Sequence, residues 1–169
     1  MMITKKAQSW YLDLVIGIMI FVLSLSIFFK TEVNQSREEE NIITNMKLEA
    51  KFIASSLASQ GNPTNWTLDD VVEIGITDNY RINQTKLEAF ASMDYETAKE
   101  KLRTIYDFYV FFKTREGIQP VNDSIEGVGK PGVNSTNVYE KEKPKHIVTT
   151  SRLLIRNSMP TKMVVYLWK

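Results

Sequence analysis

A long run without charge near the start of the chain constrains its fold more than any other feature. Residues 14–29 are sixteen positions without a charged side chain, and after Gly17 the next residue that breaks helices is Gly61. Neither Pro nor Gly interrupts the sequence between these two glycines. This pattern predicts one continuous helix whose first part is apolar enough for lipid.

The length of this apolar segment matches a membrane. Residues 10–29 would extend over ~30 Å at ~1.5 Å per residue, which is the hydrocarbon thickness of a bilayer. Trp10 and Tyr11 are typical of the lipid–water interface, and Lys30 can reach the headgroups. Asp13 lies near the helix start, where water is close. We therefore predict a single transmembrane segment over residues 10–29.

Beyond the apolar segment the helical pattern becomes amphipathic. Apolar residues recur at steps of four, four, three and four, at Ile42, Met46, Ala50, Ile53 and Leu57. Such spacing places them on one face of a helix, where a folded domain can cover them. Gly61 supplies the expected stop, and Pro63 prevents the helix from resuming. The sequence thus predicts a long helix over residues 8–60 and a head over residues 61–169.

The head shows signals for short helices followed by strands. Thr67 and Asp70 resemble a capping box before a brief helix that ends at Gly75, and Asn83 and Asp94 suit the N-caps of two more helices. The other expected segments are helices over 84–92 and 95–105, a strand over 107–113, an exposed loop over 119–137, and a hairpin of strands 146–156 and 161–168. Helices first and an antiparallel sheet last indicate an α+β fold.

Composition and motifs argue against several functional classes. The net charge is +1 without a basic stripe, which argues against nucleic acid as a partner. There is no cysteine, hence neither a disulfide nor a thiolate metal site, and the single histidine, His146, is expected to be a surface residue. No set of nucleophile, base and orienting residue stands out. We therefore expect no enzyme, no metal and no cofactor.

Asparagine sequons indicate the orientation of the predicted transmembrane segment. Lysine and arginine are nearly balanced around it and do not decide the orientation. The N-x-[ST] triplets, all of which follow the segment, begin at Asn34, Asn65, Asn83, Asn122 and Asn134. We therefore predict N-glycosylation at these positions, a cytoplasmic N-terminus and an extracellular C-terminal domain. A chain rich in Asn, Ser and Thr also forms such triplets by chance, and this alternative stays open.

The N-terminus resembles a known type of leader. Lys5-Lys6-Ala7-Gln8-Ser9, followed directly by an apolar span with an early acidic residue, resembles the class III signal peptide of archaeal type IV pilin-like proteins. The resemblance implies that residues 1–7 form a leader, which a prepilin-type signal peptidase cuts between Ala7 and Gln8. It also implies a long N-terminal helix, first in lipid and then amphipathic, that carries a mostly β head.

The same resemblance implies a role for Asp13 in assembly. An early acidic residue in this family pairs with the new N-terminal amine of a neighbouring subunit while filaments form. Asp13 would be the sixth mature residue, whereas the family typically has Glu as the fifth, and Ala7 replaces the more usual Gly before the cut. Two alternatives stay open: Asp13 is solvated by lipid headgroups, or the whole segment is an uncleaved signal anchor. A secretory signal cut after Ser26 is the least favoured alternative, because the apolar residues 27–29 would follow the cut.

The expected function follows from this architecture. We expect a non-catalytic, membrane-anchored extracellular subunit of pilin-like type that assembles into a type IV pilus-like surface filament. Its expected partners are membrane lipid, the signal peptidase and other copies or related subunits. Gly17, Ser24 and Ser26 permit close approach of apolar helices in such an assembly. The alternative is a single-pass envelope anchor with an external binding or accessory domain that does not polymerise.

Overall fold

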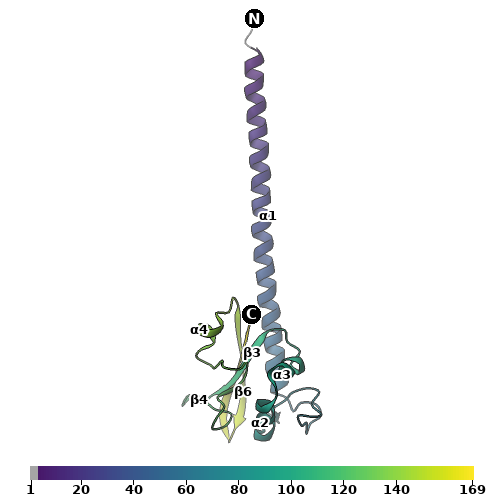
Figure 1. Cartoon of the computed structure of the whole chain (residues 1–169), viewed down its shortest axis with the longest axis vertical. Helices are drawn as coiled ribbons and strands as arrows, with labels where there is room; N and C mark the ends of the chain where they lie inside the picture. Colours follow the sequence, from purple (N-terminus) through teal and green to yellow (C-terminus); the bar gives the residue numbers. More distant parts are fainter. Residues whose placement is uncertain (1–3) are drawn as a thin grey trace. The chain divides into compact units, whose positions relative to one another are not determined.

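The structure contains one long helix and a head of short helices and strands (Figure 1). This computed structural model describes the backbone of residues 4–169 and the side chains of residues 11–32 and 37–169. The chain divides into two compact units, Met1–Ile42 and Ile43–Lys169. Helix α1, Thr4–Leu57, begins in the first unit and ends in the second. The predicted α+β fold, with a long N-terminal helix before a β-sheet head, is confirmed.

Seven strands of the described chain form one curled sheet in the head. They are β1 (Thr77–Asp78), β2 (Arg81–Ile82), β3 (Asp107–Lys113), β4 (Ile118–Gln119), β5 (Gly127–Gly129), β6 (Ile147–Arg156) and β7 (Met159–Trp168). The strand order is β1-β2-β6-β7-β3-β4, and β5 also pairs with β3. Every pair is antiparallel except β2 with β6. The main part of the sheet is therefore antiparallel, as predicted, and one parallel pair lies at its edge.

Side chains on both faces of the sheet are buried. In β3, Phe108, Val110 and Phe112 point to one face and are fully buried, while Tyr109 and Phe111 are buried on the other. The second face carries a smaller apolar cluster that also includes Val133, Val138, Val164 and Trp168. Figure 1 shows α4 (Val138–Glu142) on one side of the sheet and α2 (Gln84–Ser92) and α3 (Tyr95–Lys101) on the other. Because both faces are covered, β3 forms a continuous apolar run.

The last turns of α1 supply part of the core on the helical side of the sheet. The residues of the predicted stripe that are at most 1% exposed are Met46, Ala50, Ile53 and Leu57. Ala54 is fully buried as well and widens the stripe. Gly61 has a φ of +77°, the left-handed conformation expected at the stop. The amphipathic half of the long helix is thus part of the head.

The chain returns very closely against the end of α1. A Cβ atom on Gly75 would lie 2.1 Å from Gly61 N and 2.5 Å from Ser59 O, so this position accepts only glycine. The indole Nε1 of Trp66 donates a hydrogen bond of 2.7 Å to Gly75 O, and Trp66 is buried. These contacts hold the segment that follows Gly61 on the helix end.

The prediction of a brief helix after Thr67 is wrong, because residues 68–70 form a turn. Asp70 Oδ1 accepts hydrogen bonds from Thr67 N at 2.5 Å and from Thr67 Oγ1 at 2.9 Å. The capping residues therefore close a turn instead of starting a helix. Glu73 then forms an isolated antiparallel β-bridge with Asn62.

The two later helices are confirmed with their caps. The Asn83 side chain accepts a hydrogen bond from Lys86 N at the start of α2, and Asp94 accepts from two backbone amides at the start of α3. Helix α3 ends at Lys101 instead of residue 105. Arg103 has a φ of +54°, which a continuing helix cannot accommodate.

The segment predicted as an exposed loop, 119–137, is partly built into the sheet. Strands β4 and β5 pair with β3, and Val128 and Val133 are buried. A Cβ atom on Gly127 or Gly129 would lie within 2.4 Å of a carbonyl oxygen of β3. Glycine in this segment permits close approach of two backbones. The prediction of an exposed loop is therefore wrong for the part of 119–137 that pairs with β3.

The C-terminal hairpin is confirmed with a shorter turn than predicted. Asn157 and Ser158 have φ of 49° and 65° and form a two-residue turn, so β7 already begins at Met159. Leu154 is 1% exposed and Leu153 is 72% exposed. The even-numbered side chains of β6 therefore face the core. The sequence pattern did not decide which of the two faces of this strand is buried.

Candidate functional site

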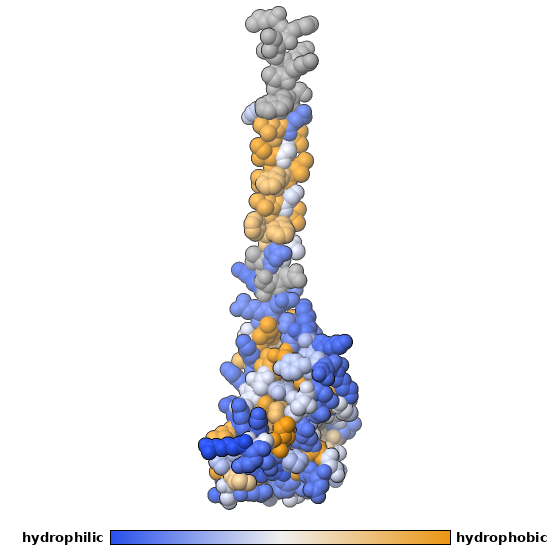
Figure 2. Space-filling model, turned by 90° about the vertical axis from the view of Figure 1, so that its left-hand side faces the viewer, coloured by the Kyte–Doolittle hydropathy of each residue, from blue (hydrophilic) through white to orange (hydrophobic). Residues whose placement is uncertain are grey.

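The first unit carries an extended apolar surface. Between Tyr11 and Phe29, the large apolar side chains of α1 are 41% to 66% exposed, and no part of the described chain covers them. Figure 2 shows this segment as an orange band. It is the one helix of the described chain that is long and apolar enough to cross a membrane, which is consistent with single-pass anchoring.

Polar side chains within this segment are satisfied by their own helix. Ser24 Oγ donates to Ile20 O and Ser26 Oγ donates to Val22 O, both at 2.8 Å. These bonds let hydroxyl groups enter lipid at low cost. Asp13 is exposed on the same helix and forms no ion pair within the described part of the chain.

The two residues of the predicted leader cut belong to the first turns of α1. The side chains of Ala7 and Gln8 lie outside the described residues, although both belong to α1. The side chain of Asn34 also lies outside them. The predicted cut and this sequon stay predictions.

The remaining sequons differ in their surroundings. Asn65 is exposed. Asn83 is half-buried, and its Nδ2 donates to Asp78 Oδ2 at 2.7 Å while its Oδ1 caps α2. Asn122 and Asn134 are half-buried, and their Oδ1 atoms accept backbone hydrogen bonds in tight turns. Glycosylation stays a prediction at all of them, and a carbohydrate on Asn83 would have to displace its amide from Asp78.

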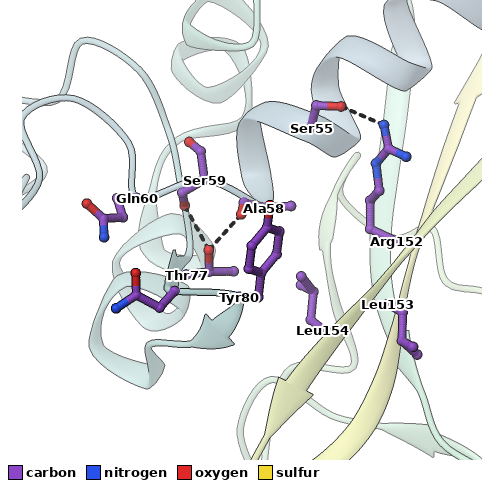
Figure 3. Close-up of a pocket in the computed structure, with 10 residues that line it drawn as sticks. Ser55, Ala58, Ser59, Gln60, Thr77, Tyr80, Arg152, Leu153 and Leu154 are labelled. Atoms are coloured by element: carbon purple, nitrogen blue, oxygen red, sulfur yellow. Dashed lines mark hydrogen bonds between the residues drawn. The ribbon is translucent and has the colours of Figure 1, made fainter.

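The head contains a groove of about 510 Å³ beside the end of α1 (Figure 3). It is lined by Ser55 and residues 58–60, by Thr77, Asn79 and Tyr80 of the β1–β2 hairpin, and by residues 152–154 of β6. Arg152 Nη2 donates to Ser55 Oγ at 2.7 Å across the groove. Thr77 Oγ1 donates to Ala58 O at 2.7 Å and fixes the floor. No acidic residue is among the described residues that line this groove.

Tyr80 stands at the mouth of the groove in an unusual conformation. Asn79 and Tyr80 have φ of 51° and 63° and form the two-residue turn between β1 and β2. A left-handed conformation is strained for a bulky residue, and glycine is usual at the second position of such a turn. Tyr80 is nevertheless 71% exposed, so burial of its ring does not repay the strain. Figure 3 shows the ring between the end of α1 and Leu154.

A buried lysine, Lys86, links Asp78 of β1 to Gln60, which follows the end of α1. Lys86 is 5% exposed, and its Nζ donates to Asp78 Oδ1 at 2.6 Å and to Gln60 O at 3.1 Å. Hydrogen bonds from Lys86 and Asn83 hold the pKa of the Asp78 carboxyl below its ordinary value. The ammonium lies near the carbonyl end of α1, where a positive charge is favourable. This arrangement explains Lys86 as a structural residue.

A second ionic cluster joins α3 to β3. Asp107 accepts hydrogen bonds from Tyr95 Oη at 2.8 Å, Lys99 Nζ at 3.0 Å and Lys130 Nζ at 2.8 Å. Lys130 also binds Glu142. Burial alone would raise the pKa of the Asp107 carboxyl, but the hydrogen bonds from Lys130, Lys99 and Tyr95 outweigh burial and hold it below its ordinary value. Each charged group of this cluster is thus paired with an opposite charge within it.

The side chains that could ligate a metal ion do not cluster in the described part of the chain. Among the residues that the structure describes, no group of three or more His, Asp or Glu side chains is placed to hold a metal ion. His146 is half-buried just before β6, and its Nε2 has no hydrogen-bond partner in the described chain. The sequence predicts His146 at the surface, whereas its Nε2 atom is buried. Its backbone pairs with that of Lys169.

The fold and these surfaces define a class of protein: an α+β head attached to one apolar N-terminal helix that is long enough to span a membrane. No protein-family model matches the chain, and no curated protein or solved structure shows significant similarity to it. Sequence reasoning did not find the groove, because Tyr80 and Arg152 are far apart in the chain.

Proposed function

We propose that this chain is a pilin-like subunit, anchored by residues 10–29 with its head outside the cell. The observation that carries the proposal is the uncovered apolar surface of α1 between Tyr11 and Phe29, in a helix whose end is part of the head core. Lipid covers such a surface in the precursor, and the apolar segments of other copies cover it after assembly. The function is mechanical, without a catalytic step.

A second apolar surface supports packing between copies. Leu48 and Phe52 are 60% and 54% exposed and lie one turn apart on α1, while Met46, Ala50 and Ile53 are buried. The helix therefore has one face for its own head and apolar side chains on another. Ridges of this kind pack into the grooves of a neighbouring helix.

Processing and orientation belong to the same proposal. A prepilin-type signal peptidase cuts between Ala7 and Gln8 on the cytoplasmic side, and Asp13 pairs with the new amine of a neighbouring copy. In a low dielectric such a pair is favoured, because an unpaired carboxylate there is costly. The head is extracellular and carries carbohydrate at exposed sequons such as Asn65.

The N-terminal peptide of the protein purified from membranes tests processing. A mature chain that starts at Gln8 is expected by mass spectrometry, and an intact Met1 or Met2 would contradict the cut and favour an uncleaved anchor. Protease added to whole cells is expected to degrade the head. A protected head would refute the orientation.

Assembly is tested at Asp13. Asp13→Ala is expected to abolish surface filaments seen by electron microscopy while the protein stays in the membrane at its usual amount. Asp13→Glu is the matched control and is expected to keep filaments, because it retains the charge. Filaments of normal number in Asp13→Ala would refute the assembly role.

A second candidate function is a single-pass anchor whose head binds another component and never polymerises. The groove favours this candidate, because it exposes Tyr80 and offers Arg152 no acidic partner among its described lining residues, and packing between copies does not require it. A cell that displays the head but no filament containing this chain would support it.

A further inference from the structure

The two edges of the head sheet differ in how they are covered. On one side, β4 and β5 pair with β3 along residues 109–113. On the other, β2 meets the ten-residue strand β6 at a single position, Arg81 opposite Ile155. No other strand within the described chain pairs with this edge. Residues 147–154 of β6 therefore form an open sheet edge.

The open edge directs a row of backbone groups outward. Ile155 N donates to Tyr80 O at 3.0 Å, away from β7. Backbone groups alternate in direction along an antiparallel strand, so the N–H and C=O groups of Thr149, Ser151 and Leu153 point the same way as those of Ile155. The side chains of Thr149 and Leu153 are exposed, Leu153 to 72%, and that of Ser151 is half-buried.

This edge lacks the features that usually protect one. The strand is long, contains no proline, and keeps a continuous register with β7 without a bulge. Arg152 is the single charged residue between 147 and 154. Folded proteins normally block such an edge, since it pairs readily with any extended chain. An edge left open in this way is suited to binding by strand addition.

The groove described above lies at one end of the open edge. Leu153 and Arg152 line both, and the groove holds the Arg152 guanidinium without an acidic neighbour among its described lining residues (Figure 3). The bond to Ser55 Oγ uses Nη2 and fixes the position of the side chain. A guanidinium held in this way is a binding group for a carboxylate.

We propose that the β6 edge binds an extended segment of a partner protein, which adds as a strand along residues 147–153 and places an acidic side chain beside Arg152. Backbone hydrogen bonds supply the affinity, and the groove selects the acidic residue at one end of the segment. The proposal does not depend on whether the chain forms filaments.

Charge complementarity favours a different protein over a second copy as the occupant. Residues 147–156 contain Arg152 and Arg156 but neither Asp nor Glu. Pairing between the β6 edges of two copies would therefore leave both Arg152 side chains without a carboxylate. An acidic segment of another chain supplies the missing charge.

The probe for the test is a fluorescent heptapeptide, Thr-Val-Thr-Val-Thr-Val-Glu, with its Glu→Gln form as the matched control. Both are titrated by anisotropy against the full-length protein in detergent micelles. The Glu peptide is expected to bind about fivefold more tightly than the Gln peptide. Arg152→Gln is expected to abolish this difference and to leave the Gln peptide unaffected. Equal affinity of both peptides for the wild type would overturn the acidic selection.

Backbone pairing is tested at Ser151, whose N–H points outward. Ser151→Pro removes this donor and is expected to weaken the peptide about tenfold or more, whereas Ser151→Ala keeps it and is expected to bind normally. Unchanged binding by Ser151→Pro would overturn strand addition. If the proline variant fails to fold, hydrogen exchange of the wild type decides.

Hydrogen exchange reports the edge directly. In the free protein, the amides of Thr149, Ser151 and Leu153 are expected to exchange fast, while those of Thr150 and Arg152, which face β7, are protected. Saturating Glu peptide is expected to protect the first three. No added protection would overturn the proposal. Protection that rises with protein concentration without peptide would assign the edge to a second copy and also overturn it.

Discussion

Substitution of Ile53 tests whether the end of α1 belongs to the core of the head. Ile53 is 1% exposed. Replacement by Ala removes three carbon atoms, which costs about 2.4 kcal/mol in transfer free energy at about 0.8 kcal/mol each. A residual cavity adds to this, so Ile53→Ala is expected to lower the free energy of unfolding by about 3–4 kcal/mol. For a domain of this size the melting temperature should fall by roughly 12–16 °C.

Phe52, the residue just before Ile53 in the helix, provides the matched control. It is larger than Ile53 but 54% exposed, so Phe52→Ala is expected to cost less than about 1 kcal/mol. Alanine also has the higher helix propensity, which offsets part of that loss. Side-chain size alone would predict the opposite order of the two variants, so the comparison isolates burial.

The assay is thermal unfolding of the full-length protein in detergent micelles, followed by near-ultraviolet circular dichroism. This signal reports aromatic packing in the head, where Trp66 and Trp168 are buried. Equal shifts for Ile53→Ala and Phe52→Ala would refute the assignment of the buried stripe. An unchanged melting temperature for Ile53→Ala would show that the head folds without the end of α1.

Three further predictions concern the head. Gly75→Ala should destabilise it by about 3 kcal/mol or more, because the new Cβ would lie 2.1 Å from a backbone nitrogen, whereas Gly17→Ala, with nothing within 4 Å, should leave its melting temperature unchanged. The folded-state pKa of Asp107 is lowered, so its contribution is present above the unfolded pKa of about 3.9 and is lost as the pH falls through the folded value. Melts between pH 6 and 2 should therefore show a decline below about pH 4 that Asp107→Asn reduces; an identical decline in both proteins would contradict it. Asp78→Ala leaves the Lys86 ammonium buried without its carboxylate, so it should destabilise the head more than the double variant with Lys86→Met, and chemical denaturation checks this order.

The elements that could be predicted are those whose pattern is local. The α1 stripe from Met46 to Leu57 follows a helical period, and β3 is a dense apolar run, so both were identified within a few residues. The N-caps Asn83 and Asp94 act over three residues and were also found. In each case the side chains that decide the structure are neighbours in the chain.

The elements that were missed depend on contacts between distant segments. β5 forms because Gly127 and Gly129 let the chain lie directly against β3, and no local pattern separates such glycines from loop glycines. The groove combines Ser55 with Tyr80 and Arg152 across the fold. The open edge of β6 follows from which strand is absent beside it, a property of the whole sheet.

The course of α1 links the anchor to the head. The second compact unit is Ile43–Lys169, so residues 43–57 of the helix fold with the sheet, and the chain that follows Gly61 packs on the helix end through Trp66 and Gly75. A head reduced to residues 61–169 would lack Met46, Ile53 and Leu57 and would expose the apolar surface that they cover. Because one uninterrupted helix contributes both the exposed apolar segment and this part of the core, the helix cannot be replaced by an unrelated anchor fused at Gly61. In the proposed subunit, folding of the head and retention in the membrane therefore depend on two segments of the same helix.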